Sequence, residues 1–215
     1  MELYIIRHGD PDYANDTLTE KGWEEAKKLG PRMAALHPVK IFASPRKRAQ
    51  DTAKPACELL GQTFQVEDWM NESMDYMQSL GDDEASVANY DVYGYRTTIG
   101  KGCERLKDFA PSRTEALDRM IANSDDFFAR LGFIREGLRY RAADPVEGNV
   151  LCFCHGGFGT AWIGHLLGMD PAYTWLKLDL FTTAVTRFTF MVKDGYAIPR
   201  MRYLGDTSHL TRAPF

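Results

Sequence analysis

The chain has 215 residues, of which 44% are hydrophobic and 26% charged, and its formal net charge is -4 at pH 7. This length suits one α/β domain that buries its own core without metal or disulfide cross-links. The acidic balance disfavours nonspecific binding to nucleic acid or to a membrane surface, and no apolar run is long enough to span a bilayer.

The cysteines and the N-terminus indicate the compartment. Cys57, Cys103, Cys152 and Cys154 have neither CxxC nor zinc-type spacing. Cys152 and Cys154 alternate along a predicted strand and would share one face, which is typical of small buried hydrophobic residues in a reducing compartment. The chain begins with a strand-like segment and shows no export signal, so we expect a cytoplasmic protein.

The first predicted strand ends in two basic side chains. Residues 3–6 form a continuous apolar run, which is typical of a strand buried on both faces. Arg7, His8 and Gly9 follow it directly. Groups just past the carboxyl ends of parallel strands lie where open α/β sheets bind ligands. Taken alone, the pattern is equally compatible with a strand that ends in a chance basic pair.

A polar loop, residues 10–16, and a helix are expected next. Thr19 has the features of an N-cap, and apolar residues continue at helical spacing beyond it. Gly30 and Pro31 should kink or end this helix, because proline removes a backbone donor and clashes with the preceding turn.

The second predicted strand, residues 39–43, leads into a helix with an unusual start. Ser44 as N-cap and Pro45 at the first helical position give a strong start signal, and Gly61 is a suitable end. Three basic residues occupy the first turn, where cations oppose the helix dipole. The three are Arg46, Lys47 and Arg48.

Two interpretations of this basic turn stand side by side. Local rules tend to be broken at functional sites, and a helix N-terminus with added cations favours a phosphate. A solvated basic patch fits Arg46 and Lys47 well. Arg48 lies closer to the apolar stripe and is the better candidate for a pocket.

The parallel-sheet signals stop after a third predicted strand, residues 63–66, and return at residues 149–154. The intervening stretch, about 73–147, is rich in acids, tyrosines and glycines, with a helical segment near 113–140. We interpret it as a mostly helical insertion over the carboxyl edge of the sheet, acting as a lid or substrate wall. Its first tyrosines are Tyr76, Tyr90, Tyr93 and Tyr95.

The last part of the chain repeats the design of the first strand. Residues 149–154 run into His155 and Gly156, and a helix from about 158 to 167 follows. Two further strands, 184–192 and 196–203, are joined at Asp194-Gly195, a strong hairpin signal. The pattern predicts an α/β three-layer sandwich with a mostly parallel sheet and an antiparallel edge strand. We expect a single domain, with its core at 1–72 and 148–215.

Several strand and helix ends should converge at one edge of this sheet. They would bring together Arg7, His8, Arg48 and His155. Phosphoryl transfer needs mainly positioning and charge stabilisation, and arginine forks match phosphate oxygens in pairs. Histidine can act as ligand or nucleophile toward phosphorus. The residues therefore indicate a phosphoryl-binding pocket.

At these residues the chain resembles the histidine phosphatase superfamily, which is phosphoglycerate mutase-like and carries an Arg-His-Gly motif. The matching pieces stand in family order and cover the sheet core, 1–66 and 149–203. They are RHG at 7–9, LTEKG at 18–22, SPRKRAQDTA at 44–53 and HG at 155–156.

The resemblance implies that His8 is the nucleophile and forms a phosphohistidine. It implies that Arg7, Arg48 and His155 hold the phosphate oxygens and that an acid after the third strand protonates the leaving oxygen. Water would then hydrolyse the intermediate. His8 must offer a neutral nitrogen while its other nitrogen donates to a fixed acceptor. Gly9 and Gly156 would let the backbone approach the phosphate.

The acid is the open assignment. The family usually has a carboxylate followed by Phe-Gly and Trp-Glu-Gly, whereas this chain has Trp-Met-Asn-Glu at 69–72. We favour Glu72, with Glu67 and Asp68 as alternatives and a surface role open for each. An acid that gives up a proton near neutral pH should have a raised pKa.

Other polar residues are less marked. Tyr13 and Asn15 follow the first motif and are candidate substrate contacts, although a polar surface loop explains them equally well. His37, His165 and His209 have no motif around them, and we expect structural or surface roles.

Three functions are compared. A phosphatase acting on a small phosphorylated metabolite is favoured, because the chain lacks the Asn-Glu-Arg-His-Tyr-Gly segment of phosphoglycerate mutases. A mutase and a noncatalytic phospho-ligand-binding protein are the alternatives. No metal and no other cofactor is expected, since Arg7 and Arg48 supply the positive charge. We expect no nucleic-acid or membrane partner; the substrate and the oligomeric state, a homodimer included, stay open.

Overall fold

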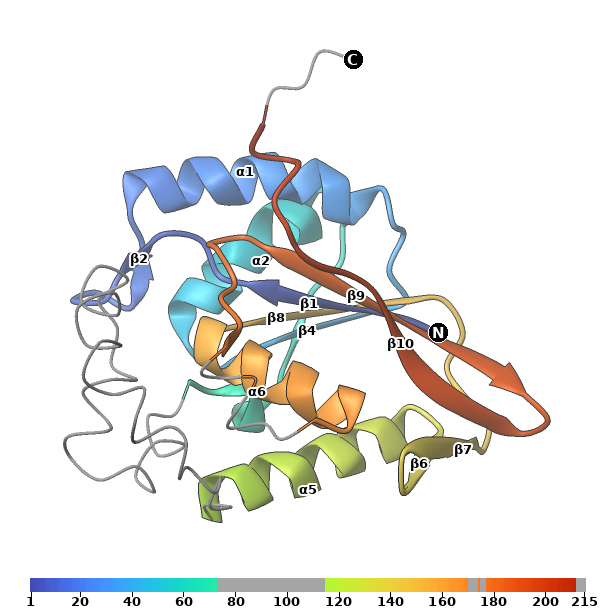
Figure 1. The fold of residues 1–215 in the computed structure, drawn as a ribbon. Helices are drawn as coiled ribbons and strands as arrows, with labels where there is room; N and C mark the ends of the chain where they lie inside the picture. Colours follow the sequence, from blue (N-terminus) through green and yellow to red (C-terminus); the bar gives the residue numbers. More distant parts are fainter. Residues whose placement is uncertain (73–114, 170–173, 175–176, 212–215) are drawn as a thin grey trace.

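The computed structural model describes residues 1–72, 115–169, 174 and 177–211. In this part of the chain an eight-stranded sheet has the order β5-β4-β8-β1-β9-β10-β7-β6 (Figure 1). Its strands are β1 (Glu2–Arg7), β4 (Lys40–Ala43), β5 (Gln65–Val66), β6 (Phe133–Glu136), β7 (Arg139–Ala142), β8 (Asn149–Cys154), β9 (Val185–Lys193) and β10 (Tyr196–Asp206). The helices are α1 (Glu20–Ala34), α2 (Lys47–Leu60), α5 (Glu115–Arg130), α6 (Gly156–Leu167) and the 3-10 turn η1 (Asp68–Met70). A small hairpin joins β2 (Pro11–Asp12) and β3 (Thr17–Leu18).

The sheet is mixed, and most of its strands run in one direction. β5, β4, β8 and β1 are parallel, as predicted. β9 is antiparallel to β1 and β10 to β9, and Asp194 and Gly195 form their turn with positive φ values of 53 and 78. The predicted antiparallel strands therefore exist, but β7 and β6 extend the sheet beyond them.

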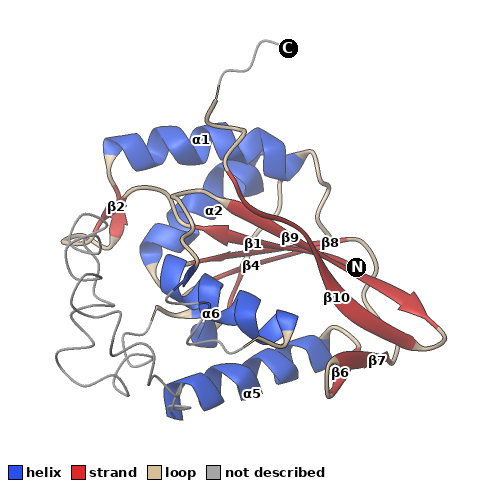
Figure 2. Cartoon of the chain, viewed as in Figure 1, coloured by secondary structure: helices blue, strands red, loops and turns tan. Residues whose placement is uncertain are grey.

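Helices cover both faces of the sheet and make it the middle of three layers (Figure 2). Tyr4 and Ile6 of β1 pack with residues of α1 and α2 on one face. Leu3 and Ile5 point the other way and pack with residues of α5 and α6. Fully burying an aliphatic side chain stabilises a fold by roughly 1.5–3 kcal/mol, so this two-sided burial fixes the register of β1.

Helix α1 does not end at Gly30-Pro31, which corrects the sequence prediction. It continues through Pro31 to Ala34, because Leu29 and Met33 on the same side are fully buried in the core. A Cβ on Gly30 would lie 2.8 Å from Cβ of Pro55 in α2. Gly30 thus permits close packing of the two helices.

The helix predicted at 113–140 is also shorter than expected. α5 ends at Arg130, and the chain turns at Gly132, whose φ is 82. A Cβ there would lie 2.3 Å from the carbonyl oxygen of Asp144, so only glycine fits. The following residues form β6 and β7, with Phe133 and Tyr140 buried in the core. Residues 73–114 of the predicted insertion, with its first tyrosines, lie outside the described residues.

The described cysteines are buried free thiols. Cys152 and Cys154 share the face of β8 that packs toward α5 and α6, as their alternation predicted. Cys57 lies in the core under α1 and α2, and Cys103 is outside the described residues. Within the described ranges, no helix is both long enough and apolar enough to cross a membrane.

The parallel strands place three chain segments side by side at their carboxyl ends. The backbone ladder continues past the strands, since the N–H of His8 donates to Cys154 O at 3.0 Å and that of Ser44 donates to Phe153 O at 2.9 Å. His155 follows β8 at the same edge. This edge carries the candidate site.

Candidate active site

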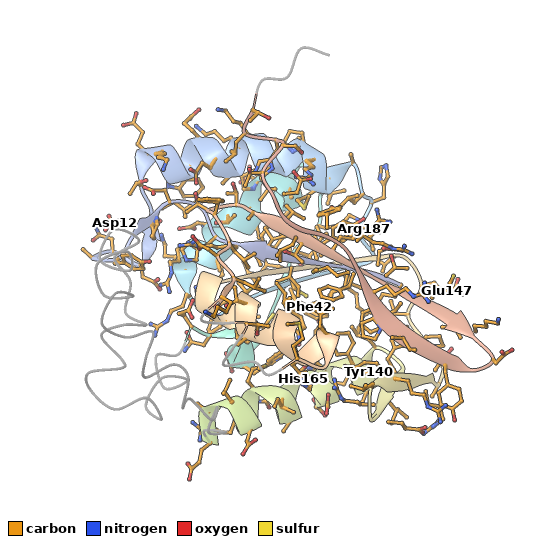
Figure 3. All side chains as sticks on the ribbon, viewed as in Figure 1. Asp12, Phe42, Tyr140, Glu147, His165 and Arg187 are labelled. Carbon is orange, nitrogen blue, oxygen red and sulfur yellow. The ribbon has the colours of Figure 1, made fainter. Side chains whose placement is uncertain are left out.

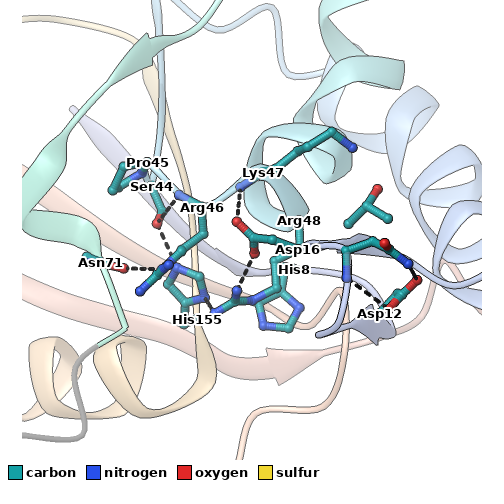
Figure 4. Close-up of polar contacts among 12 residues, drawn as sticks. His8, Asp12, Asp16, Ser44, Pro45, Arg46, Lys47, Arg48, Asn71 and His155 are labelled. Carbon is teal, nitrogen blue, oxygen red and sulfur yellow. Dashed lines mark hydrogen bonds and ion pairs between the residues drawn. The ribbon is translucent and has the colours of Figure 1, made fainter.

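The two histidines that follow β1 and β8 lie side by side (Figure 4). The ring centroids of His8 and His155 are 5.2 Å apart and the rings meet edge to face. His8 is 2% exposed and His155 0%. The repeated pattern of strand, histidine and glycine therefore brings both imidazoles into one buried place, as predicted.

The proton on the His8 ring is fixed by the backbone. Its Nδ1 lies 2.7 Å from the carbonyl oxygen of Gly9, which only accepts, so Nδ1 carries the proton and Nε2 keeps its lone pair. Burial lowers the pKa of His8 to about 3, with further lowering by Arg7 and Arg48. The ring is therefore neutral at physiological pH and presents a nucleophilic nitrogen.

The proton on the His155 ring is fixed by two side chains. Nη2 of Arg48 lies 3.2 Å from Nδ1 and can only donate, so Nδ1 accepts. Nε2 then donates to Oγ of Ser44 at 2.6 Å. Burial and the neighbouring His8 lower the pKa of His155 well below its usual value. In this arrangement His155 holds Arg48 in place.

Ser44 is not the N-cap of α2, contrary to the sequence prediction. The helix begins at Lys47, and its N-cap Arg46 makes no side-chain capping bond. The Ser44 hydroxyl is instead used by His155 and by the backbone N–H of Arg46, at 3.2 Å. A serine before proline predicts a cap by local rules, but the tertiary contact with His155 overrides them.

Arg48 is 8% exposed, and its guanidinium lies next to the ring of His155 (Figure 4). Its Nη1 pairs with Asp16 at 2.5 Å, and the ring of Tyr13 lies 5.4 Å from its guanidinium carbon. Arg7 approaches from β1, where its Nη1 donates to the carbonyl of Leu180. In the described part of the chain, the only buried side-chain nitrogens or oxygens without a hydrogen-bond partner are Nε of Arg7 and Nε of Arg48. Two unsatisfied buried donors fit an anion with several oxygens.

Arg7, His8, Tyr13 and Arg48 line a cavity of about 720 Å³, whereas His155 and Asp16 do not. Glu72 lines it too and accepts the backbone N–H of Phe158 at 3.0 Å through Oε1. Burial has the largest effect on Glu72 and raises its pKa. The bond from Phe158 and the positive charges of Arg48 and Arg7 act in the opposite direction. A carboxyl group with a raised pKa beside two arginines can donate a proton.

The two alternative acids are placed elsewhere. Glu67 accepts two bonds from Arg130, at 2.9 and 2.8 Å, and a third from Nε1 of Trp69. Asp68 is exposed on η1, and neither carboxylate lines the cavity. The geometry therefore favours Glu72 over both.

The predicted substrate-binding residues are only partly brought together. Tyr13 and Gly156 line the cavity, whereas Gly9 and Asn15 do not. A Cβ on Gly9 would lie 2.8 Å from Gly22 O, so the close approach is to α1. The Asn15 amide donates to Asp12 at 2.7 Å.

Two threonines that sequence reasoning did not single out hold the peptide that follows His8. Thr183 N–H donates to the carbonyl of His8 at 3.1 Å. Oγ1 of Thr52 accepts Gly9 N–H at 3.0 Å and donates to Arg48 O at 2.7 Å. Thr52 lies on the buried side of the 44–53 motif, which is the signal that could have found it.

The remaining histidines lie outside this cavity. His165 contacts Asp125 at 3.1 Å and Arg135 at 3.0 Å, near Tyr140 (Figure 3). His209 contacts Thr183 at 2.9 Å, and His37 is exposed. Among the described residues, no group of three or more histidines, cysteines or carboxylates could hold a metal ion.

An α/β sandwich with paired histidines and arginines at the carboxyl edge of its parallel strands defines a phosphoryl-transfer type of site. The chain belongs to the histidine phosphatase superfamily (branch 1), whose family model matches residues 3–200. This confirms the resemblance read from the four motifs. As a member, it is an enzyme of the phosphatase or mutase type.

The similar proteins include both types. A probable phosphoglycerate mutase, GpmB, of Enterobacter sp. (strain 638) is 23% identical, over 98% of this chain and 95% of the relative. Mycobacterial glucosyl-3-phosphoglycerate phosphatase in complex with VO3 has a TM-score of 0.63 at 20% identity, covering 95% of this chain and 98% of its own. Phosphoserine phosphatase of Entamoeba histolytica, in complex with 3-phosphoglyceric acid, has a TM-score of 0.65 at 20% identity, covering 98% and 99%. These structural likenesses show the shared fold.

Proposed function

We propose that this protein hydrolyses small phosphomonoesters through a phosphohistidine on His8. The observation that carries the proposal is the fixed tautomer of His8. Its Nδ1 proton is held by Gly9 O, which leaves the Nε2 lone pair for attack on phosphorus beside Arg7 and Arg48.

In the first step, Nε2 of His8 bonds to phosphorus and the bond from phosphorus to the ester oxygen breaks. Glu72, whose pKa is raised by burial, enters this step as the carboxylic acid and gives its proton to the departing oxygen. Arg7 and Arg48 stabilise the charge on the equatorial oxygens with donors that include their unsatisfied Nε groups. His155 keeps Arg48 oriented, and its Nδ1 could bind phosphate only after gaining a proton.

In the second step, water attacks the phosphohistidine. The Glu72 carboxylate takes a proton from the water, the bond between Nε2 and phosphorus breaks, and phosphate leaves. The enzyme returns to neutral His8 and protonated Glu72. Each group ends in its starting state, and no metal or cofactor is needed for the balance of charge and protons.

The names of similar proteins support this proposal. Two solved structures with this fold are a glucosyl-3-phosphoglycerate phosphatase and a phosphoserine phosphatase. The relative named as a probable phosphoglycerate mutase favours a second candidate function, isomerisation of a phosphoglycerate. A mutase must hold the dephosphorylated product until it is rephosphorylated, whereas a phosphatase releases phosphate.

A panel of phosphorylated metabolites tests the proposal directly. We expect phosphate release and an acid-labile phosphoenzyme from the wild type, both lost in His8→Ala and retained in His37→Ala, whose histidine is exposed. EDTA should leave turnover unchanged. Efficient interconversion of 2- and 3-phosphoglycerate without phosphate release would favour the mutase. Unchanged hydrolysis in His8→Ala would exclude the mechanism.

A further inference from the structure

The N-terminus of α2 combines positive charge with a missing cap. Arg46, Lys47 and Arg48 lie at its start, and Arg46 in the N-cap position makes no side-chain capping bond. Cations at this end oppose the helix dipole. An anion is expected there, and the sequence indicated a phosphate.

A carboxylate of the chain itself fills this position. Asp16, at the tip of the β2–β3 hairpin, accepts the backbone N–H of Lys47 at 3.0 Å through Oδ2. Its Oδ1 accepts Nη1 of Arg48 at 2.5 Å. Figure 4 shows the carboxylate bridging the helix start and the Arg48 guanidinium. Asp16 thus caps α2 from outside the helix.

The hairpin tip is held where this bridge requires it. Asp16 adopts a positive φ of 48, which aspartate tolerates better than most residues. The next residue, Thr17, donates to the buried Asp51 of α2 at 2.5 Å. The ring of Tyr13 packs over the Arg48 guanidinium. These contacts come from both sides of Asp16, so its carboxylate is a built part of the site.

The position of Asp16 relative to the cavity determines what it can do. Arg48 lines the cavity and Asp16 does not, so a phosphate that enters the cavity need not displace Asp16 from Arg48. The negative charge of Asp16 nevertheless raises the pKa of His8 slightly, whereas burial, Arg7 and Arg48 lower it. A phosphate bound to Arg48 would therefore share that arginine with the Asp16 carboxylate.

We propose that Asp16 is a built-in counter-anion of Arg48 that weakens the pocket's hold on phosphate and so speeds release of the product. The inference rests on the proposed function, because it concerns the same pocket. Arg7 is partly exposed and lies 3.8 Å from Asp179, whereas the buried Arg48 has Asp16 as its acidic partner. An uncompensated Arg48 beside Arg7 would bind a phosphate dianion more tightly, and a tightly held product limits turnover. Asp16 offsets part of that attraction while keeping Arg48 in place.

Asp16→Asn tests the inference, because asparagine has the same size, tolerates the positive φ and can still accept one of the two bonds. We would measure the binding of inorganic phosphate by titration calorimetry. The dissociation constant should fall by at least about threefold, and the gain should shrink as salt is raised. Asp12→Asn is the matched control: it removes the same charge from the same hairpin, and none of the contacts of Asp12 reaches Arg48. The affinity of Asp12→Asn for phosphate should equal that of the wild type.

Unchanged or weaker phosphate binding in Asp16→Asn would overturn the inference, since Asp16 would then only support Arg48. Equal tightening in Asp12→Asn would overturn it too, as a general charge effect. Binding is measured without turnover, so the result is separate from the proposed function. That function fails if the wild type forms no phosphoenzyme and releases no phosphate from any monoester.

Discussion

At the residue scale, the environment moves the pKa values of two groups in opposite directions. Burial and the neighbouring arginines lower the pKa of His8 to about 3, which keeps the proposed nucleophile neutral. Burial raises the pKa of Glu72, which favours the protonated form of its carboxyl group. Titratable groups pushed apart in this way mark the acid and the base or nucleophile of a site. The structure thus supports different roles for His8 and Glu72.

Glu72→Gln should slow the hydrolysis of esters with a poor leaving group much more than the hydrolysis of esters with a good leaving group. Glutamine cannot give up a proton, so kcat for an alkyl phosphate should fall by about 100-fold or more. An aryl phosphate whose phenolate leaves without protonation, such as p-nitrophenyl phosphate, should lose far less in its phosphorylation step. The measurements are the rate of phosphate release from the alkyl ester and the burst of phenolate release from the aryl ester, each compared between Glu72→Gln and the wild type.

Asp68→Asn is the control for this experiment, because Asp68 is an exposed neighbour that does not line the cavity. It should leave both substrates unaffected. Equal losses on the alkyl and aryl esters in Glu72→Gln would show that Glu72 positions groups without donating a proton. The acid would then have to be sought elsewhere in the chain.

At the scale of secondary-structure elements, the peptide between His8 and Gly9 is clamped from two sides. Thr183, just before β9, binds its carbonyl, and Thr52 of α2 binds its N–H. Thr52 also donates to the carbonyl of Arg48, so one hydroxyl ties the nucleophile's loop to the helix that carries the arginine. Thr52 is 1% exposed, and water cannot replace it easily.

Thr52→Val should therefore impair catalysis more than it impairs phosphate binding. Valine has the same shape but leaves the Gly9 N–H unpaired, at a cost of about 1–3 kcal/mol in stability. We expect kcat per active site to fall by about tenfold, because a small misplacement of a reacting group is expensive. Thr52→Ser keeps the hydroxyl and should restore most of the rate.

Active-site titration through the phosphoenzyme distinguishes positioning from a loss of folded protein. A structural role alone would reduce the number of sites and leave the rate per site unchanged. The same rate per site in the valine and serine variants would contradict the positioning role of Thr52.

The sequence predicts the strand ends of this fold better than it predicts the contacts made there. β1 and β8 were predictable because strands buried on both faces read as unbroken apolar runs. Ser44 was assigned as a helix cap because only neighbours in sequence enter such a rule, whereas its partner His155 is distant along the chain. The passage of α1 through Pro31 likewise depends on packing against α2, seen at Gly30.

In the candidate site, too, residues at the ends of strands and helices were predictable, whereas contacts between distant residues were not. Arg7, His8, Arg48 and His155 were predictable from motifs at element ends. The structure places the first three on the cavity and His155 in contact with His8 and Arg48. Asp16 was missed because it acts across a hairpin on another element, and its sequence neighbours carry no signal of that contact. The preference for Glu72 over Glu67 as the proposed acid rests on the pairing of Glu67 with Arg130, which the sequence does not show.

At the scale of the whole molecule, the site stands at the junction of two cores. β1 contributes Leu3 and Ile5 to the core with α5 and α6, and Tyr4 and Ile6 to the core with α1 and α2. His8 at the end of β1 and the adjacent His155 after β8 are both buried at this edge. Burying them as neutral rings links the stability of the whole domain to pH.

Stability should fall as the pH drops below about 6.5, and His8 accounts for part of the loss. Its pKa is about 3 in the folded protein and near 6.5 in the unfolded chain, so the unfolded chain binds more protons between these values. The unfolded state is therefore favoured increasingly as pH falls from 6.5 toward 3, by about 2 kcal/mol at pH 5 from His8 alone. The lowered pKa of His155 acts in the same direction.

Urea unfolding at pH 7 and pH 5 measures this contribution. His8→Asn removes the titrating ring, so the variant should lose about 2 kcal/mol less than the wild type between the two pH values. His37→Asn, a change at an exposed histidine, should behave as the wild type. If His8→Asn and the wild type lose the same free energy of unfolding, His8 is not held neutral by the fold. The neutral nucleophile on which the proposed reaction depends would then lack its physical basis.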